Sequence, residues 1–231
     1  LPEFTVENPT TLDGALALLA DHAGRALPIA GGTDLLPNLK HQLLAPEVLV
    51  SLAKVAELRG IAVDADGALV IGAMTPLDEL ANHSEVITRA PALAQAASIV
   101  ASPQIRRMGT LGGNVMLDTR CRYINQTHFW RKALGYCLKK DGTLCHVVAG
   151  GKKCVAAASN DTAPALMTLG GELVLRSRDG GERRMKVDDL RDLVTHTVRL
   201  DATDPKALAE QRISEMDAIV VSFGSHFETA L

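Results

Sequence analysis

The sequence predicts an α+β fold, and three observations point to this class. Two glycine-containing turns, Asp66-Gly67 and Asp179-Gly180-Gly181, each join two strand-like runs, which is typical of β-hairpins. Several leucine- and alanine-rich stretches carry apolar residues at helical spacing. Strands and helices do not alternate steadily along the chain, which favours α+β over a doubly wound parallel sheet.

The predicted strands are short runs of apolar and β-branched residues. Single strands are expected at residues 4–7, 26–30 and 47–52, and the two hairpins span 60–73 and 171–187. A further strand is expected at 218–223, where the sequence reads AIVVSF.

The predicted helices follow from apolar spacing and from their entry residues. Asn8-Pro9-Thr10-Thr11 leads into a helix over 12–23, and Thr75-Pro76 leads into a shorter one over 77–83. A longer helix is expected over 86–100, and others over 159–170 and near 205–211. The AGGTDLL and TLGGNVM stretches are expected to be double-glycine turns, the first followed by a helical turn.

The bulk composition is that of an ordinary globular protein. The 231 residues are 47% hydrophobic and 22% charged, which suffices for one or two domains with a sizeable core. No apolar run approaches the roughly 20 residues that span a bilayer, and the first residues do not read as a secretory signal. We therefore expect a cytoplasmic protein, with neither a membrane nor a nucleic acid as its partner.

The segment from residue 121 to 154 holds all four cysteines, the single tryptophan and both tyrosines. Between residues 118 and 159, eight lysines and arginines face two aspartates, although the whole chain has a net charge of −3. A basic segment in an otherwise acidic chain indicates an anionic ligand or an acidic partner, or simply a solvated loop.

The cysteine spacing, C-x15-C-x7-C-x8-C, leaves several kinds of site open. Four thiolates could bind zinc, but the close C-x2–4-C pairs of most zinc sites are missing. Two disulfides would suit an exported protein, and no export signal is seen. A [4Fe-4S] cluster needs four thiolates and tolerates wide spacing. A segment this short needs some such staple, because it cannot bury enough apolar surface alone.

The two glycine stretches, AGGTDLL and TLGGNVM, could hold phosphate groups. Consecutive glycines let a ligand approach the backbone, and successive N–H groups can form an anion-binding concavity. Neither stretch matches the dinucleotide or Walker patterns, so a purely structural pair of turns remains open at this point.

Four motifs in order resemble a known family. The AGGTDLL turn, IGAMTPLDEL (71–80), TLGGN and DTAPALM (161–167) together resemble the FAD-binding subunit of the molybdenum hydroxylase (xanthine dehydrogenase) family, over about residues 3–190. The resemblance implies an FAD-binding fold of two α+β subdomains, over 1–55 and 56–190, with the cofactor between them. It also marks 118–158 as an insertion. Residues 191–231 then form a short C-terminal remnant in which the family's usual C-terminal domain is absent or divergent.

The resemblance implies roles for individual residues. The first turn would wrap the pyrophosphate through backbone amides, with a hydroxyl from Thr33; its residues are Ile29, Ala30, Gly31, Gly32, Thr33, Asp34, Leu35 and Leu36. The second turn would form the other phosphate wall, from Thr110, Gly112, Gly113 and Asn114. Ala101 would lie near the cofactor, and Asp161 would bind its ribose or ribityl hydroxyls.

Within that family, the insertion is similar to one in the 4-hydroxybenzoyl-CoA reductase branch. The matching stretches are DTRCRYINQ, GYCLKK, LCHVV and KKC. The resemblance implies that Cys121, Cys137, Cys145 and Cys154 bind a [4Fe-4S] cluster. His146, beside Cys145, is expected to have a packing or surface role rather than to be a ligand.

The implied protein is an oxidoreductase subunit that transfers electrons through FAD and a [4Fe-4S] cluster. Its partners would be a molybdenum-cofactor large subunit, a [2Fe-2S] small subunit and a ferredoxin-like carrier, and the complex would reductively dehydroxylate an aromatic acyl-CoA. One alternative is the flavin subunit of an oxidatively running molybdenum hydroxylase. Another, of a different class, is a zinc-stapled scaffold without catalysis. Acid–base catalysis in this chain is not expected.

Overall fold

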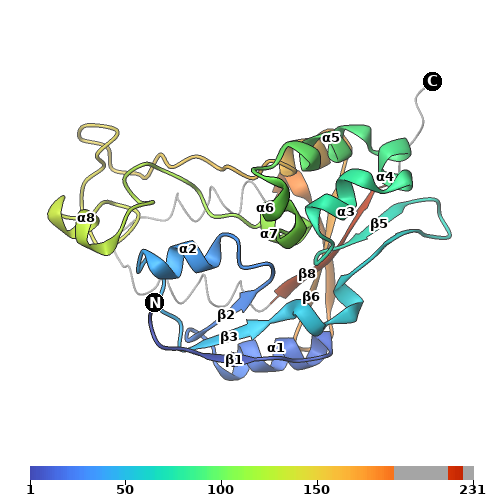
Figure 1. Cartoon of the computed structure of the whole chain (residues 1–231), viewed down its shortest axis with the longest axis horizontal. Coiled ribbons are helices and arrows are strands. Elements are labelled where there is room, and N and C mark those ends of the chain that lie inside the picture. The colour runs from blue at the N-terminus through green and yellow to red at the C-terminus, as the bar shows by residue number, and fades with distance from the viewer. Residues whose placement is uncertain (190–217, 226–231) are drawn as a thin grey trace.

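The computed structural model describes residues 1–189 and the backbone of residues 218–225. Two sheets organise this part of the chain, and Figure 1 shows them in two adjacent bodies. The first sheet is parallel in the order β1-β3-β2, and the second is antiparallel in the order β4-β5-β8-β6-β7. The predicted mixture of helices and strands is confirmed.

The first sheet is built from three short strands, β1 (Thr5–Glu7), β2 (Ala26–Ile29) and β3 (Val48–Ser51). Helix α1 (Leu12–Asp21) packs on it, and the Thr11 hydroxyl caps that helix by accepting a hydrogen bond from the Gly14 amide. Helix α2 (Leu35–Lys40) follows the first glycine turn, and two 3₁₀ turns (Leu52–Lys54 and Ala56–Leu58) lead out of β3. Buried residues of α1 and β3, with Val55, Leu58 and Met74, form this core.

The second sheet contains both predicted hairpins. Strands β4 (Ile61–Val63) and β5 (Leu69–Gly72) form one, and β6 (Glu172–Ser177) and β7 (Glu182–Lys186) form the other. Strand β8 (Ala218–Ser225) confirms the predicted strand at 218–223 and lies between β5 and β6. The predicted C-terminal remnant thus supplies the strand that joins the two hairpins, whereas the helix expected near 205–211 lies outside the described residues.

Helices α3 (Leu77–Asn82), α4 (Ser84–Arg89), α5 (Pro91–Ile99) and α9 (Ala163–Thr168) contribute buried residues to the second core, together with β5 and β6. The prediction of one helix over 86–100 is wrong, because the chain breaks between α4 and α5. Pro91 lacks an N–H and disfavours a helical backbone at the residue before it, so Ala90 leaves the helical region (φ −136°, ψ 55°) and α5 starts anew.

The second glycine stretch is a short helix and not the predicted turn. Helix α6 (Pro103–Met108) ends just before it, and α7 (Leu111–Val115) contains both Gly112 and Gly113. The Thr110 hydroxyl caps α7 by accepting from the Gly113 amide. The two glycines have a poor helix propensity. The Thr110 cap and the burial of Leu111 and Val115 in the core outweigh it.

The insertion (residues 118–158) leaves the second body after α7, extends past α2 and returns to α9 (Figure 1). Arg120 and Ala157 close its neck with two backbone hydrogen bonds, of 2.7 and 3.0 Å. Its one helix in the described chain is α8 (His128–Ala133). In residues 1–189 and 218–225, none of the helices is long and apolar enough to span a bilayer.

Leu80, fully buried on α3, tests the second core. Leu80→Ala should lower the free energy of unfolding by about 2–5 kcal/mol, because it leaves a cavity among packed helices. Ile87→Ala on α4, at a side chain that is 50% exposed, is the control and should change it by less than about 0.5 kcal/mol. Urea unfolding measures both, and equal effects would contradict the assigned core.

Candidate functional site

The two glycine stretches lie directly against each other. A Cβ atom on Gly31 would overlap the Met108 carbonyl oxygen and lie 2.5 Å from its carbon, so only glycine fits at this position. A Cβ on Gly109 would lie 3.6 Å from the Thr33 hydroxyl, and one on Gly113 would lie 4.0 Å from Ala30. The structure thus brings together the two walls that the sequence places about 80 residues apart.

The first glycine turn offers free backbone donors. Among the described residues, the amides of Gly31, Gly32, Thr33, Asp34 and Leu35 have no backbone or side-chain acceptor, whereas the Leu36 amide donates to the Gly32 carbonyl. Gly32 has a left-handed backbone (φ 70°), which turns the chain sharply at this point. Consecutive free N–H groups in such a turn are suited to bind a phosphate.

The second wall differs, because its amides are used inside the protein. The amides of Leu111 and Gly112 donate to the carbonyls of Thr75 and Ala73, at 3.0 and 2.8 Å, and the Gly113 amide donates to the Thr110 hydroxyl. These three amides are therefore not available to a ligand, and the role of TLGGN as a second phosphate wall stays a prediction. Its glycines instead give close packing, since a Cβ on Gly112 would lie 2.9 Å from Ala73.

Asn114 connects this wall to the predicted ribose-binding carboxylate. Its side chain is buried, donates to Asp161 at 3.1 Å and accepts from the amide and hydroxyl of Thr162 at 3.0 and 2.7 Å. Asp161 itself is exposed at the start of α9. Asn114 thus positions Asp161, and its side-chain oxygen and one of its two N–H donors are engaged within the protein.

Other predicted site residues lie around the same turns. Ile29, Ala30 and Leu35 are half-buried, and Leu36 is exposed. Ala101 is exposed, just before α6, and its left-handed backbone (φ 44°) is unusual for alanine. The Asp34 side chain accepts from Asn38 and forms an ion pair with Arg120, which directs it toward the insertion.

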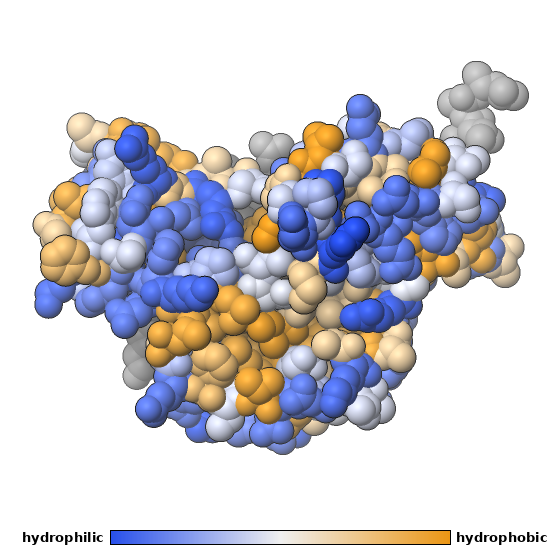
Figure 2. Space-filling model, in the orientation of Figure 1, coloured by the Kyte–Doolittle hydropathy of each residue, from blue (hydrophilic) through white to orange (hydrophobic). Residues whose placement is uncertain are grey.

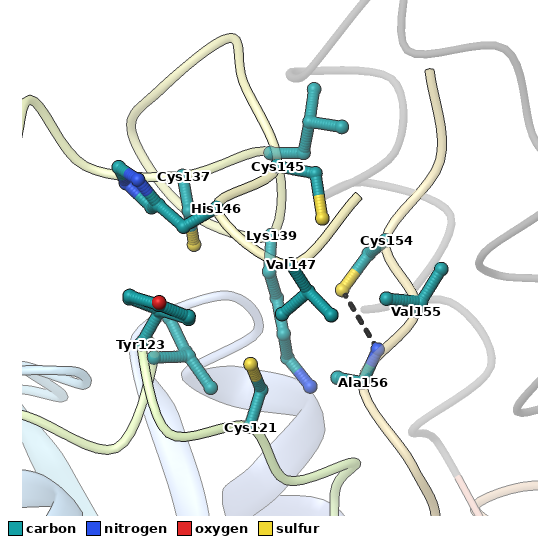
Figure 3. A pocket seen from close by; sticks show the side chains of 12 residues that line it. Cys121, Tyr123, Cys137, Lys139, Cys145, His146, Val147, Cys154, Val155 and Ala156 are labelled. Carbon is teal, nitrogen blue, oxygen red and sulfur yellow. Dashed lines mark hydrogen bonds between the residues drawn. The ribbon is translucent and has the colours of Figure 1, made fainter. Parts of the chain in front are cut away.

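All four cysteines line one pocket in the insertion, and Figure 3 shows their sulfur atoms turned toward the same space. We call it the cysteine pocket. It is lined by Cys121, Tyr123, Ile124, Cys137, Leu138, Lys139, Cys145, His146, Val147, Cys154, Val155 and Ala156. The thiols are free and half-buried. Burial raises the pKa of the Cys154 thiol, and the Ala156 amide and the Lys139 charge oppose this rise.

The predicted convergence of the cysteines is thus seen, but in a spread arrangement. Within the described ranges, 1–189 and 218–225, the structure has no group of three or more His, Cys, Asp or Glu side chains close enough to hold one metal ion. His146 stacks on Tyr123 (ring centroids 5.0 Å apart) and contacts the Tyr136 carbonyl at 2.6 Å, which agrees with its expected packing role.

A buried arginine fixes the insertion to the first body. Arg131 on α8 is 2% exposed and donates to the carbonyls of Gln126, His41 and Gln42, at 3.2, 3.4 and 2.9 Å. His41 and Gln42 directly follow α2, while Asp34, which pairs with Arg120, precedes it. In the sequence both arginines are simply basic residues of the insertion, because nothing in the local pattern distinguishes a buried arginine from a solvated one.

Similar proteins place the chain in a known family. FAD-binding domains of molybdopterin dehydrogenases match residues 2–213 as a family. The chain belongs to this family. The predicted family and its mixed helix–strand FAD-binding fold are therefore confirmed, while the closeness to the 4-hydroxybenzoyl-CoA reductase branch and the roles of single residues remain predictions.

Relatives of the chain include subunits of several dehydrogenases. It is 40% identical to the carbon monoxide dehydrogenase medium chain of Hydrogenophaga pseudoflava over 114 residues, which are 49% of this chain and 39% of the relative. It is 44% identical to the xanthine dehydrogenase FAD-binding subunit of Escherichia coli O157:H7 over 105 residues, 46% of this chain and 36% of that subunit. The matched segment thus spans less than half of these relatives' length.

Solved structures show the same fold. Carbon monoxide dehydrogenase from Hydrogenophaga pseudoflava matches with a TM-score of 0.67 and 24% identity, over 99% of this chain and 61% of that one. Quinoline 2-oxidoreductase from Pseudomonas putida 86 matches with a TM-score of 0.64 and 23% identity, over 99% and 60%. At these identities the likeness concerns the fold alone.

Gly31→Ala tests the contact between the two walls. Because the added methyl group overlaps the Met108 carbonyl, the turns must separate, and we expect FAD affinity to fall more than about tenfold, or about 1.4 kcal/mol. The flavin-to-protein absorbance ratio after purification measures this. Gly14→Ala in α1, where the new methyl lies 3.0 Å from the Thr11 hydroxyl and 3.6 Å from the Pro9 Cβ, is the control and should keep its flavin.

Arg131→Met tests the attachment of the insertion. The substitution leaves the carbonyls of His41 and Gln42 without their charged donor, which should cost roughly 1–3 kcal/mol. We expect faster protease cleavage within residues 118–158, because local opening becomes easier. Lys132→Met, at the exposed neighbour on α8, should leave the cleavage rate unchanged, and equal rates for both variants would contradict the assigned contact.

Proposed function

We propose that the chain is the FAD-binding, electron-transferring component of a molybdenum hydroxylase-type oxidoreductase. The observation that carries this proposal is the close contact of the two glycine stretches, in which Gly31 packs against the Met108 carbonyl and the Gly31–Leu35 amides have no acceptor among the described residues. Family membership and relatives named as FAD-binding subunits and medium chains of dehydrogenases support it. Flavin supplies both one- and two-electron transfer, which lets such a component join carriers of either kind.

The residues of the first turn would hold the FAD pyrophosphate through their amides, and the Thr33 hydroxyl would add a donor. Asp161 would accept from the ribose or ribityl hydroxyls, held in place by Asn114. FAD reconstitution of the full chain tests this assignment. We expect about one FAD per chain, and a chain that stays colourless with excess FAD would contradict the proposal.

We further propose that the cysteine pocket holds a [4Fe-4S] cluster, bound by Cys121, Cys137, Cys145 and Cys154. A single zinc ion needs its sulfur ligands about 2.3 Å from one centre, and hence close to one another. The spread arrangement of the four thiols fits a cluster better, because each thiolate then binds a different iron atom. The pocket is otherwise lined mainly by apolar side chains, which would limit the access of water.

Cys137→Ser tests the cluster. After anaerobic purification, the wild-type chain should contain about four irons with matching acid-labile sulfide, and the variant should lose most of both while retaining FAD. His146→Gln, at the other potential ligand of the pocket, is the control and should keep its iron. One zinc per chain without iron would instead support the zinc-stapled scaffold.

We propose that the complete enzyme oxidises its substrate, as the names of the relatives indicate. They are dehydrogenases of carbon monoxide, xanthine and nicotinate. Reductive dehydroxylation of an aromatic acyl-CoA is the second candidate, and the four-cysteine insertion favours it. Assays of the purified complex with an aromatic acyl-CoA under reducing conditions, and with purines or pyridines plus an acceptor, discriminate the two.

The partners we propose are a molybdenum-cofactor large subunit, a [2Fe-2S] small subunit and a ferredoxin-like electron carrier. Names such as medium chain and FAD-binding subunit denote parts of multi-chain enzymes in the relatives. The insertion offers a docking face for an acidic carrier, since it holds eight lysines and arginines against two aspartates. Figure 2 shows this lobe covered largely by hydrophilic residues.

A further inference from the structure

Lys139 extends across the cysteine pocket. It lies in a tight turn after Cys137, where the Lys140 amide donates to the Cys137 carbonyl at 2.9 Å and the Gly142 amide donates to it at 3.2 Å. From that turn its side chain passes between the cysteines, and its amino group ends near Cys121 and Ala156 (Figure 3). The side chain is only 12% exposed, and it carries the one lysine or arginine charge among the residues that line the pocket.

The amino group is held in a fixed position. It donates to the Asp118 carboxylate and the Thr119 carbonyl, both at 2.8 Å, and to the Thr119 hydroxyl. Thr119 is buried, but the Asp118 side chain is 61% exposed. Water therefore screens the carboxylate far more than the ammonium, so a positive charge remains on the pocket side.

We propose that Lys139 raises the reduction potential of the cluster that the cysteine pocket holds. The inference depends on the proposed [4Fe-4S] cluster, which gains one electron, and so one negative charge, from an external one-electron carrier on reduction. No bond is formed or broken in this step. A fixed ammonium beside the thiolates attracts the reduced form more strongly than the oxidised form, and a half-buried pocket weakens that attraction less than bulk water would.

A structural role for Lys139 predicts something different. If it only tied the Cys137 turn to Thr119, a neutral side chain would change cluster retention but leave the potential of the retained cluster as before.

The test is a redox titration of the anaerobically purified full chain, followed by the electron paramagnetic resonance signal of the reduced cluster. K139M removes the charge and keeps most of the side-chain length, K139R keeps the charge, and K140M is the matched control at a lysine that does not line the pocket. Iron and acid-labile sulfide are measured on every sample, so an iron-free wild type overturns the proposed cluster rather than the role of Lys139.

For K139M we expect a lower potential, with at least a tenfold smaller ratio of reduced to oxidised cluster at a fixed ambient potential, which is 59 mV for one electron. K139R and K140M should titrate as the wild type. An unchanged potential in K139M, or an equal drop in K139R, would overturn the inference. If K139M loses its iron, K139Q, which keeps an N–H donor without the charge, decides: a lower potential of its retained cluster supports the inference, and a wild-type potential or a loss of iron refutes it.

Discussion

The contact between Gly31 and the carbonyl of Met108 is the constraint on which the site depends. No side chain fits between these two backbones, so the two bodies of the fold approach each other closely there. This contact brings the first turn, whose five amides at Gly31–Leu35 have no acceptor among the described residues, against the segment that joins α6 and α7. The phosphate-binding surface that we propose would therefore arise from two segments, each of which alone is an ordinary glycine-rich stretch.

The two glycine stretches look alike in sequence but serve different purposes. In the first, the chain turns sharply at Gly32, and the amides of Gly31–Leu35 have no acceptor among the described residues. In the second, glycine removes side-chain bulk so that α7 packs against Ala73, and its amides are consumed in doing so. An N–H group that already donates a hydrogen bond inside the protein is not available to donate one to a ligand. The difference between the stretches lies in their surroundings rather than in their residues.

The insertion is tied to the segment that carries the first turn. Arg120 pairs with Asp34 before α2, and Arg131 donates to the two carbonyls that follow α2. The cysteine pocket is therefore fixed relative to the predicted flavin site by contacts at both ends of one short helix. A fixed distance would suit electron transfer between the proposed flavin and the proposed cluster. The contacts also stabilise an insertion that has little core of its own, since its one described helix is six residues long.

The sequence by itself determined the hairpins, most strands including β8, the family, and the gathering of four cysteines in one segment, because turn chemistry, alternation and ordered motifs are local signals. The sequence prediction missed the break between α4 and α5. That break was nevertheless predictable, because Pro91 has no N–H to donate within a helix. Only the tertiary structure decided which amides stay free, that Asn114 is engaged by Thr162, that Arg131 is buried, and that Lys139 enters the cysteine pocket. These properties depend on partners about 20 to 90 residues distant, which no local pattern specifies.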